Sequence, residues 1–325
     1  MKFYYRVVPL KTEKINDADG YHLRKARYYI SDIPKAGFKV HLAFVRNGIE
    51  ADRIYLSAFE GCIYDTSIGK YLLEDEQVAD FNNDQLSSIA GAKPCSGLNQ
   101  QLTRANMRKL ANNRGVGWEQ MLIKSLSATQ LLFIIEYASF NSQKMVGMGA
   151  VSKDNTASGN SAENTGHTLS LGNKSGNVIN SNNIQCVTYR GEENLWGNIW
   201  KFIDGINVDN PDVFEQGQHG RLSILTDEAN VYNDAGLNTA YGSDYIYSFG
   251  YSPIYDWLFV PTEYGGNNAL PIGDRAWNSL SGERIPEFGG MWHYGTMAGI
   301  FTISFDALIT TRARNVGSRL TYFPC

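Results

Sequence analysis

The chain has 325 residues, of which 43% are hydrophobic, 12% aromatic and 19% charged, and this balance excludes a disordered protein. Its net charge of −4 and the lack of a dense basic run argue against non-specific binding to nucleic acid. The first residues lack the apolar run of a signal peptide, and the four widely spaced cysteines predict reduced thiols in a protein made inside the cell.

Residues 1–37 carry two stretches with strand propensity, at 3–8 and 27–30. We assign this part to an N-terminal strand-rich arm for attachment or oligomerisation, with two edge strands of the main domain as an equal alternative. From residue 38 onward the pattern predicts one domain, 38–325.

The main domain is expected to begin with a hairpin. Residues 38–44 alternate, Asn47-Gly48 predicts a tight turn, and 53–60 provide the partner strand. His41 stands alone in this pattern, so we interpret it as a structural histidine and not as a catalytic one.

Two helices are predicted after a polar connection over 64–98. Thr103 is expected to cap the first helix, and a capping box at 127–130 is expected to open the second. The apolar run 131–137 indicates that the second helix is buried on most sides.

Two long loops are expected to be inserted in the domain. Residues 152–184 are dominated by Ser, Asn, Gly and Thr, which favours a surface loop, although a Ser/Gly linker between two domains is the alternative. Residues 205–245 are also polar and rich in turn residues, and they make the second inserted loop.

The densest aromatic stretch spans 189–204 and contains the sequence Trp196-Gly197-Asn198-Ile199-Trp200. Its tryptophans can bury large areas, and its Gly-Asn pair permits left-handed backbone geometry. We interpret the stretch as a core strand with a turn, with ligand contact as the alternative role of the tryptophans. Glu192 and Glu193 precede it, and such neighbouring carboxylates are more often solvated or loop-pinning than an acid/base pair.

The last quarter is predicted to form a ligand-binding face. Residues 301–307 alternate, so Phe301, Ile303, Phe305 and Ala307 are expected to face the core. The preceding glycine-punctuated loop leaves Tyr, His and Met side chains free to point outward, as recognition surfaces require. The alternative is a loop that only covers the sheet. The predicted ligand-binding residues are Met291, His293, Tyr294, Thr296, Met297, Thr302, Ser304 and Asp306.

The order of these motifs resembles the formylglycine-generating-enzyme-like branch of the C-type lectin fold, over about residues 38–325. The matching features are a hairpin ending in Phe59-Glu60, two helices, the 196–200 motif, Gly-Gly-x-Trp at 289–292 and Gly-Ser-Arg-Leu at 317–320. The resemblance implies an α+β fold, a twisted antiparallel sheet with two helices and long irregular loops. The structural core residues expected from the aromatic motifs and the resemblance are Trp118, Trp196, Asn198, Trp200 and Trp292.

The branch includes phage tail proteins and the variable proteins of diversity-generating retroelements, and the 190–201 motif is most similar to receptor-binding proteins of phage tails. The resemblance thus implies a virion protein of the tail or fibre that binds a host cell-surface receptor, either protein or glycan. The alternative is a structural head-fibre, decoration or tail-assembly protein that uses the fold as a protein-binding platform. Other virion proteins and further copies of the chain, as in a trimer, are the expected partners, without nucleic acid or membrane insertion.

An enzyme is not expected. Oxidase members of the branch use a closely spaced cysteine pair near the C-terminus, whereas this chain has only Cys325 there. We find no His-x-x-x-His spacing and no Ser-His-Asp arrangement. The sequence also lacks the Glu-Pro-Asn and Gln-Pro-Asp tripeptides of calcium-dependent animal lectins. We therefore expect no catalytic residue, metal or cofactor.

Overall fold

The computed structural model describes residues 2–11, 21–97, 100–155, 161–210, 219–225 and 232–324. Strands account for 35% of the structure and helices for 13%, in one large sheet and several small ones. The fold is therefore predominantly β. The predicted α+β class, a C-type lectin-like sheet with two helices, is wrong, because polar stretches that suggest loops in the sequence pair as strands through their backbones.

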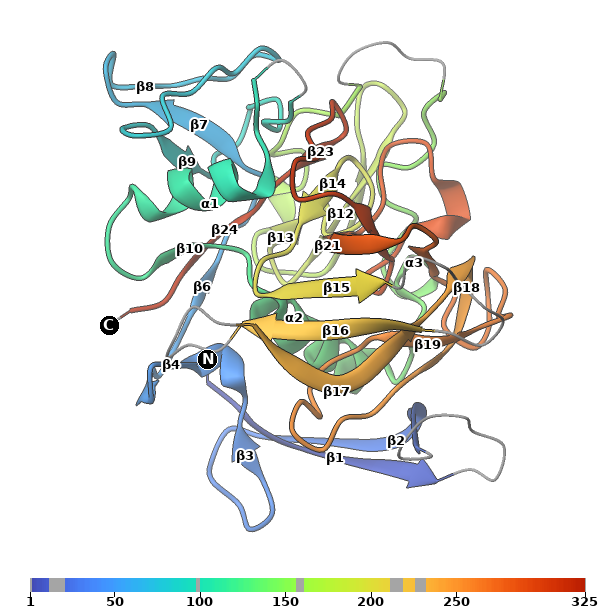
Figure 1. Ribbon diagram of the computed structural model, residues 1–325. Helices are drawn as coiled ribbons and strands as arrows, with labels where there is room; N and C mark the ends of the chain where they lie inside the picture. Colours follow the sequence, from blue (N-terminus) through green and yellow to red (C-terminus); the bar gives the residue numbers. More distant parts are fainter. Residues whose placement is uncertain are drawn as a thin grey trace.

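A ten-stranded sheet forms the centre of the molecule (Figure 1). It is mainly antiparallel, and β20–β22 and β14–β23 are its parallel pairs among the described strands. Its path runs β17 (Tyr232–Ala240), β16 (His219–Leu225), β15 (Ile206–Asn210), β21 (Gly282–Phe288), β22 (Ile303–Ala307), β20 (Arg275–Asn278), β18 (Gly242–Phe249) and β19 (Pro261–Tyr264), and β21 also pairs with β14 (Trp200–Phe202), which pairs with β23 (Val316–Gly317).

Smaller sheets surround this centre. They are β1 (Tyr4–Lys11) with β2 (Tyr21–Ser31) and β3 (Lys39–Val40); β4 (Val45–Arg46) with β5 (Ile49–Glu50); β6 (Tyr55–Leu56) with β24 (Leu320–Tyr322) and β10 (Trp118–Gln120); β7 (Cys62–Asp65) with β8 (Lys70–Tyr71) and β9 (Gln85–Ser87); and β11 (Gly176–Ile179) with β12 (Gln185–Tyr189) and β13 (Glu192–Glu193).

The helices are α1 (Arg104–Asn112), α2 (Ile123–Tyr137) and α3 (Ser142–Met145), with short 3-10 turns η1 (Leu42–Phe44), η2 (Leu169–Leu171) and η3 (Gly295–Met297). Thr103 caps α1 as predicted, because its hydroxyl accepts a hydrogen bond from Asn106 N at 3.3 Å. The capping box predicted at 127–130 is wrong. The helix α2 begins four residues earlier, where Ile123 N donates to Asp204 O, and Ser127 lies inside it.

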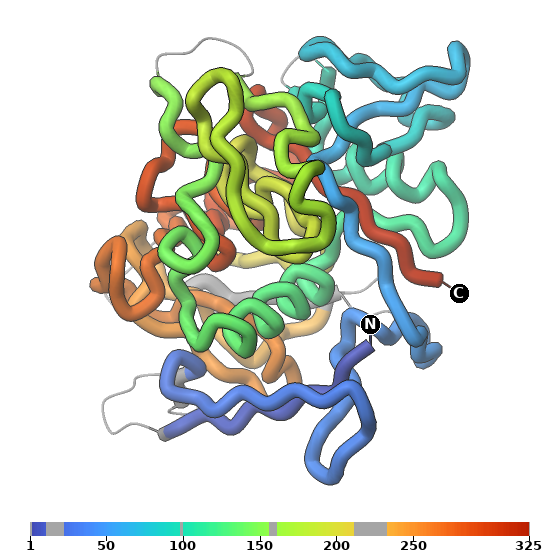
Figure 2. The backbone as a smooth tube through the Cα atoms, turned by 180° about the vertical axis from the view of Figure 1, so that it is seen from behind, coloured from blue at the N-terminus to red at the C-terminus, as the bar shows by residue number. Residues whose placement is uncertain are grey.

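The N-terminal strands pack onto the main body. Phe3, Tyr5 and Leu23 are buried in the same hydrophobic cluster as the core of α2 and the central sheet. From behind, the ribbon of β1 and β2 runs directly below α2, and both chain ends lie on the same side of the molecule (Figure 2).

The predicted opening hairpin is correct only at its turn. Asn47 and Gly48 adopt φ values of 49° and 72° and connect β4 to β5. The stretch 53–60 is not their partner strand, because Leu56 pairs with Thr321 and Tyr55 with Tyr322. This long-range pairing joins residues that are far apart in the sequence, which local pattern analysis cannot detect.

The predicted inserted loops fold further than expected. Within 205–245, the described residues form β15, β16, β17 and the start of β18, so the prediction of a loop there is wrong for those residues. The stretch 152–184 contains η2 and β11, and Ala162, Glu163 and Thr165 are buried. Residues 156–160 lie outside the described part of the chain.

Candidate functional site

The segments that carry the sequence motifs meet in the interior. Gly197 N donates to Gly289 O at 2.9 Å, and Trp292 N donates to Asn198 O at 3.0 Å. Gly197 and Asn198 have φ values of 77° and 64°, so the predicted left-handed backbone is confirmed. The Asn198 amide donates to the Glu60 carboxylate, and its oxygen accepts from the backbone. Asn198 therefore joins the separate segments.

Two buried cations complete this interior network. Lys201 Nζ lies 3.1 Å from Glu60 Oε1 and donates to Gly197 O at 2.6 Å. Arg319 donates to Glu193 O at 2.7 Å and to Ser57 O at 2.6 Å. Burial lowers the pKa of Lys201 to about 8, although the Glu60 carboxylate opposes this. Both cationic side chains are fully buried, and their hydrogen bonds join separate segments of the chain.

The tryptophans predicted to be structural differ in exposure. Trp196, Trp200 and Trp292 are buried, as is Asn198, with at most 5% exposure. Trp118 is half-buried and stacks on Tyr322 with ring centroids 4.7 Å apart. It therefore lies at the edge of the body and not in its centre.

Glu192 and Glu193 do not form an acid/base pair. Glu193 accepts hydrogen bonds from Gly166 N and from Thr168 N and Oγ1 at 2.6–2.7 Å, so it pins a loop. Glu192 accepts from Thr129 Oγ1, and burial raises its pKa to about 7. Neighbouring residues of a strand point to opposite faces, which separates the two carboxyl groups.

His41 is a structural histidine, as predicted. Its side chain is fully buried, and Nδ1 accepts a hydrogen bond from Ala43 N at 3.1 Å at the start of η1. Burial lowers the pKa of His41 to about 3, so the ring is neutral at physiological pH.

Part of the predicted ligand-binding set gathers over one side of the central sheet, which we call the C-terminal face. We define it as five predicted residues and three others that contact them: His293, Tyr294, Thr296, Met297 and Asp306, with Tyr245, Arg275 and Trp277. Strand register creates this arrangement, because Trp277 lies beside both Ser243 and Ser304, and Ser304 lies opposite Glu287. Register partners on neighbouring strands project to the same face of a sheet.

An aromatic group supports the face from below. Trp200 is buried, and its ring lies 5.4 Å from Tyr294 and 5.7 Å from Trp277, in edge-to-face contact with both. Trp277 and Tyr294 are half-buried and lie 5.3 Å apart. The Arg275 guanidinium lies 5.4 Å from the Trp277 ring. Two partly exposed rings and a cation are thus held on a rigid base.

The loop that carries Tyr294 is fixed by hydrogen bonds. Gly295 N donates to Val151 O at 3.0 Å, and Gln143 Nε2 donates to Gly295 O at 2.8 Å. The hydroxyls of Tyr245 and Thr296 lie 2.9 Å apart. These contacts hold η3 in place over the sheet.

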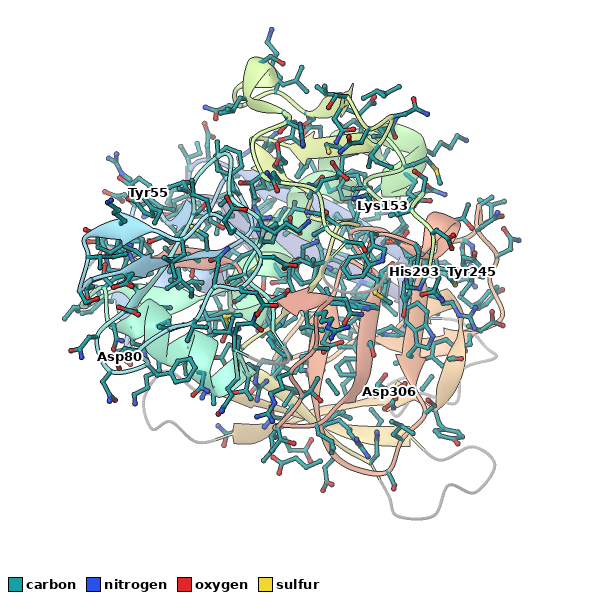
Figure 3. All side chains as sticks on the ribbon, turned by 90° about the horizontal axis from the view of Figure 1, so that it is seen from above. Tyr55, Asp80, Lys153, Tyr245, His293 and Asp306 are labelled. Carbon is teal, nitrogen blue, oxygen red and sulfur yellow. The ribbon has the colours of Figure 1, made fainter. Side chains whose placement is uncertain are left out.

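His293 lies beside this loop with its ring 5.0 Å from that of Tyr294. Its Nδ1 is buried without a partner among the described residues, and burial lowers the pKa of the ring. Seen from above, His293 and Tyr245 lie on the same side of the molecule, and Lys153 is near them (Figure 3).

Two carboxyl groups lie close together at the C-terminal face, those of Asp306 and Glu287. Asp306 accepts hydrogen bonds from Ser279 N at 2.7 Å and from Ser279 Oγ at 2.9 Å. Glu287 is buried, and burial together with the negative charge of Asp306 raises its pKa to about 8. Glu287 is therefore mainly protonated at neutral pH, and Asp306 provides the anionic charge.

Three residues of the predicted set do not point outward. Met291, Thr302 and Ser304 are buried, with exposures of 9%, 1% and 8%. Strand β22 is covered on both sides. Its register shifts between the Ile285–Ala307 and Glu287–Ser304 pairs, and Ala307 packs in the same hydrophobic cluster as Ile285 and Trp200. Phe301, Ile303, Phe305 and Ala307 are buried, as the alternation predicts. Thr302 and Ser304 are buried as well, because the opposite face of the sheet is also covered.

Sequence reasoning also missed Tyr245, Arg275 and Trp277, which lie on β18 and β20. The alternating Arg-Ala-Trp-Asn of β20 was the available signal, since its first and third residues are half-buried and the others are buried.

Within the described residues, no three His, Cys, Asp or Glu side chains gather as a metal site requires, and no helix is long and apolar enough to cross a membrane. No protein-family model matches the chain, and no curated protein matches it either.

Proposed function

We propose that the chain is a phage virion protein that binds a host cell-surface receptor through its C-terminal face. The observation that carries this proposal is the group of half-buried Trp277 and Tyr294 over buried Trp200, with cationic Arg275 and anionic Asp306 nearby. Trp, Tyr and Arg are the residues that most often dominate binding energy at interfaces. The virion setting comes from the sequence resemblance of the 190–201 motif.

The rigidity of the face supports recognition. Its loop is held by the hydrogen bonds to Val151, Gln143 and Tyr245, so little conformational entropy is lost when a partner binds. A face of this kind gains from several copies on one particle, since multivalent display raises avidity by roughly 10²–10⁴. We therefore propose a homo-oligomer that carries several such faces.

The test is adsorption to host cells. A phage that carries His293→Ala, Tyr294→Ala and Asp306→Ala together should lose adsorption while its particles assemble and incorporate the chain normally. Purified wild-type chain should compete with the phage for cells, and the triple variant should not. The matched control is Tyr29→Ala, because Tyr29 is 41% exposed and lies on the N-terminal ribbon.

Because Tyr294 packs on Trp200, the triple variant must first be shown to be folded, by a cooperative thermal melting transition. Given a folded variant, normal adsorption would rule out receptor binding by this face. Defective particle assembly with normal adsorption per particle would instead favour the structural role in the virion.

A further inference from the structure

A cavity of about 260 Å³ opens on the sheet of β6, β24 and β10, next to β9. Its walls include Tyr55, Ser57, Arg114, Trp118 and Tyr322. Tyr55 lies at the opposite side of the molecule from His293 and Tyr245 (Figure 3). The cavity is therefore separate from the C-terminal face.

Strand register builds an aromatic row along this cavity. Tyr322 pairs with Trp118 on one side and with Tyr55 on the other, so all three rings lie on one face of the small sheet. The ring centroids of Tyr322 lie 4.7 Å from Trp118 and 5.9 Å from Tyr55. Tyr55 is 51% exposed, and Trp118 is half-buried. The row offers exposed ring surface against which a flat ligand can stack.

The charge of the cavity is positive. Arg114 is its charged lining residue, and none of the lining side chains is a carboxylate. The guanidinium lies 4.3 Å from the Trp118 ring and donates to Ser87 Oγ at 2.8 Å. The stacking fixes the orientation of the guanidinium, which favours binding of an anionic group.

Ser57 lies at the wall of the cavity. Its side chain is 9% exposed and lines the cavity, and Oγ has no hydrogen-bond partner within the described chain. Its backbone is already committed, because Ser57 N donates to Leu320 O and Ser57 O accepts from Arg319. Because Oγ itself is closed off from solvent, Ser57 forms part of the cavity wall and is not a hydrogen-bonding contact for a ligand.

We propose that this cavity binds a sugar acid, that is, a pyranose ring with a carboxylate group, as one unit of an acidic saccharide. The apolar face of the pyranose stacks on the row of Tyr55, Tyr322 and Trp118, and the carboxylate meets Arg114. The volume is below the roughly 300–1,000 Å³ of pockets for drug-sized ligands, so it accommodates one ring and leaves neighbouring units in solvent.

Titration calorimetry with methyl glucuronide tests the proposal. The glucuronide should bind. Methyl glucoside, in which a neutral hydroxymethyl group replaces the carboxylate, should bind at least about tenfold more weakly, as expected for loss of a charge-assisted hydrogen bond. Equal binding of both sugars, or no binding of the glucuronide at millimolar concentration, would overturn the proposal. Binding of benzoate without the glucuronide would identify an aromatic acid site and would also overturn it.

Variants locate the site. Tyr55→Ala should weaken glucuronide binding about tenfold through lost stacking, and Tyr29→Ala, a change at a similarly exposed tyrosine, should leave it unchanged. Arg114→Gln should remove the preference for the glucuronide over the glucoside. Unchanged binding by a folded Tyr55→Ala protein would contradict this site.

The two proposals are separable. The triple variant at His293, Tyr294 and Asp306 should keep glucuronide binding, because none of these residues lines the cavity. Tyr55→Ala in turn reports on the cavity whether or not the C-terminal face binds a receptor.

Discussion

Trp200 connects the interior network to the C-terminal face. It lies two residues after Asn198, is 4% exposed, and packs edge-on against Tyr294 and Trp277. One side chain thus stabilises the core and orients the rings of the face.

Replacement of Trp200 by alanine should lower the free energy of unfolding by about 3–5 kcal/mol, the usual cost of removing a large buried aromatic side chain. Chemical denaturation followed by circular dichroism measures this. Trp118→Ala is the control, and it should cost less because Trp118 is half-buried. Equal stability of Trp200→Ala and wild type would show that Trp200 does not support the core.

Glu287 should make stability depend on pH. Its pKa is raised from 4.5 to about 8 in the folded protein, so the folded state binds the proton more tightly than the unfolded state. Its contribution to stability is full below pH 4.5 and is lost as the pH rises through about 8. Glu287→Gln should therefore flatten the fall in unfolding free energy over this range.

The slope should decrease and not vanish in that variant, because the pKa of Glu192 is also raised, to about 7. Denaturation midpoints at several pH values provide the measurement. An unchanged slope in Glu287→Gln would mean that Glu287 does not titrate as a buried acid.

At the scale of elements, the 196–200 motif crosses the Gly-Gly-x-Trp motif of 289–292 just after the end of β21. Gly289 has a φ of 88°, and a Cβ atom there would lie 2.4 Å from Leu195 O. The lack of a side chain at Gly289 allows the 195–198 segment to pass directly over the end of the strand. A glycine is needed here for two reasons, backbone conformation and close approach.

Gly289→Ala should therefore destabilise the protein more than Gly282→Ala. Gly282 opens the same strand with a φ of 80°, but a Cβ atom there meets nothing within 4 Å. Both variants carry the left-handed penalty of about 1–2 kcal/mol, and Gly289→Ala adds about 1–3 kcal/mol of overpacking. Similar melting temperatures for the two variants would show that the crossing relaxes without cost.

At the scale of the whole molecule, burial controls the reactivity of the cysteine thiols. Cys62, Cys95 and Cys186 are free and fully buried. Burial raises the pKa of Cys62 and Cys186 to about 12 and that of Cys95 well above its usual value. Because the thiolate is the reactive form, these groups should be inert in the native state.

Iodoacetamide should therefore leave these three cysteines unmodified in the native protein and label them on unfolding, with the same denaturant midpoint as tryptophan fluorescence. Mass spectrometry of the peptides measures each thiol separately. Rapid labelling of any of the three without denaturant would indicate local opening of that part of the core. The prediction of four free thiols is open for Cys325, which lies outside the described residues.

The sequence by itself determined the features that depend on neighbouring residues. These are the turn at Asn47-Gly48, the left-handed pair Gly197-Asn198, the cap at Thr103 and the burial of Trp196 and Trp200. Backbone sterics, a side-chain acceptor near a helix start and a large apolar surface act locally, so the residues alone specify them.

The tertiary structure alone decided the sheets and the arrangement of the residues in both proposed binding regions. Residues 219–225 and 232–240 form strands because neighbouring strands provide backbone partners, although their polar composition suggests a loop. Tyr55 meets Tyr322 through strand pairing between distant segments, and Tyr294 meets Trp277 because its loop packs over the sheet. Thr302 and Ser304 are buried because the central sheet is covered on both faces. Such pairings depend on which distant surfaces come together, and a periodic pattern within one segment carries no information about that choice.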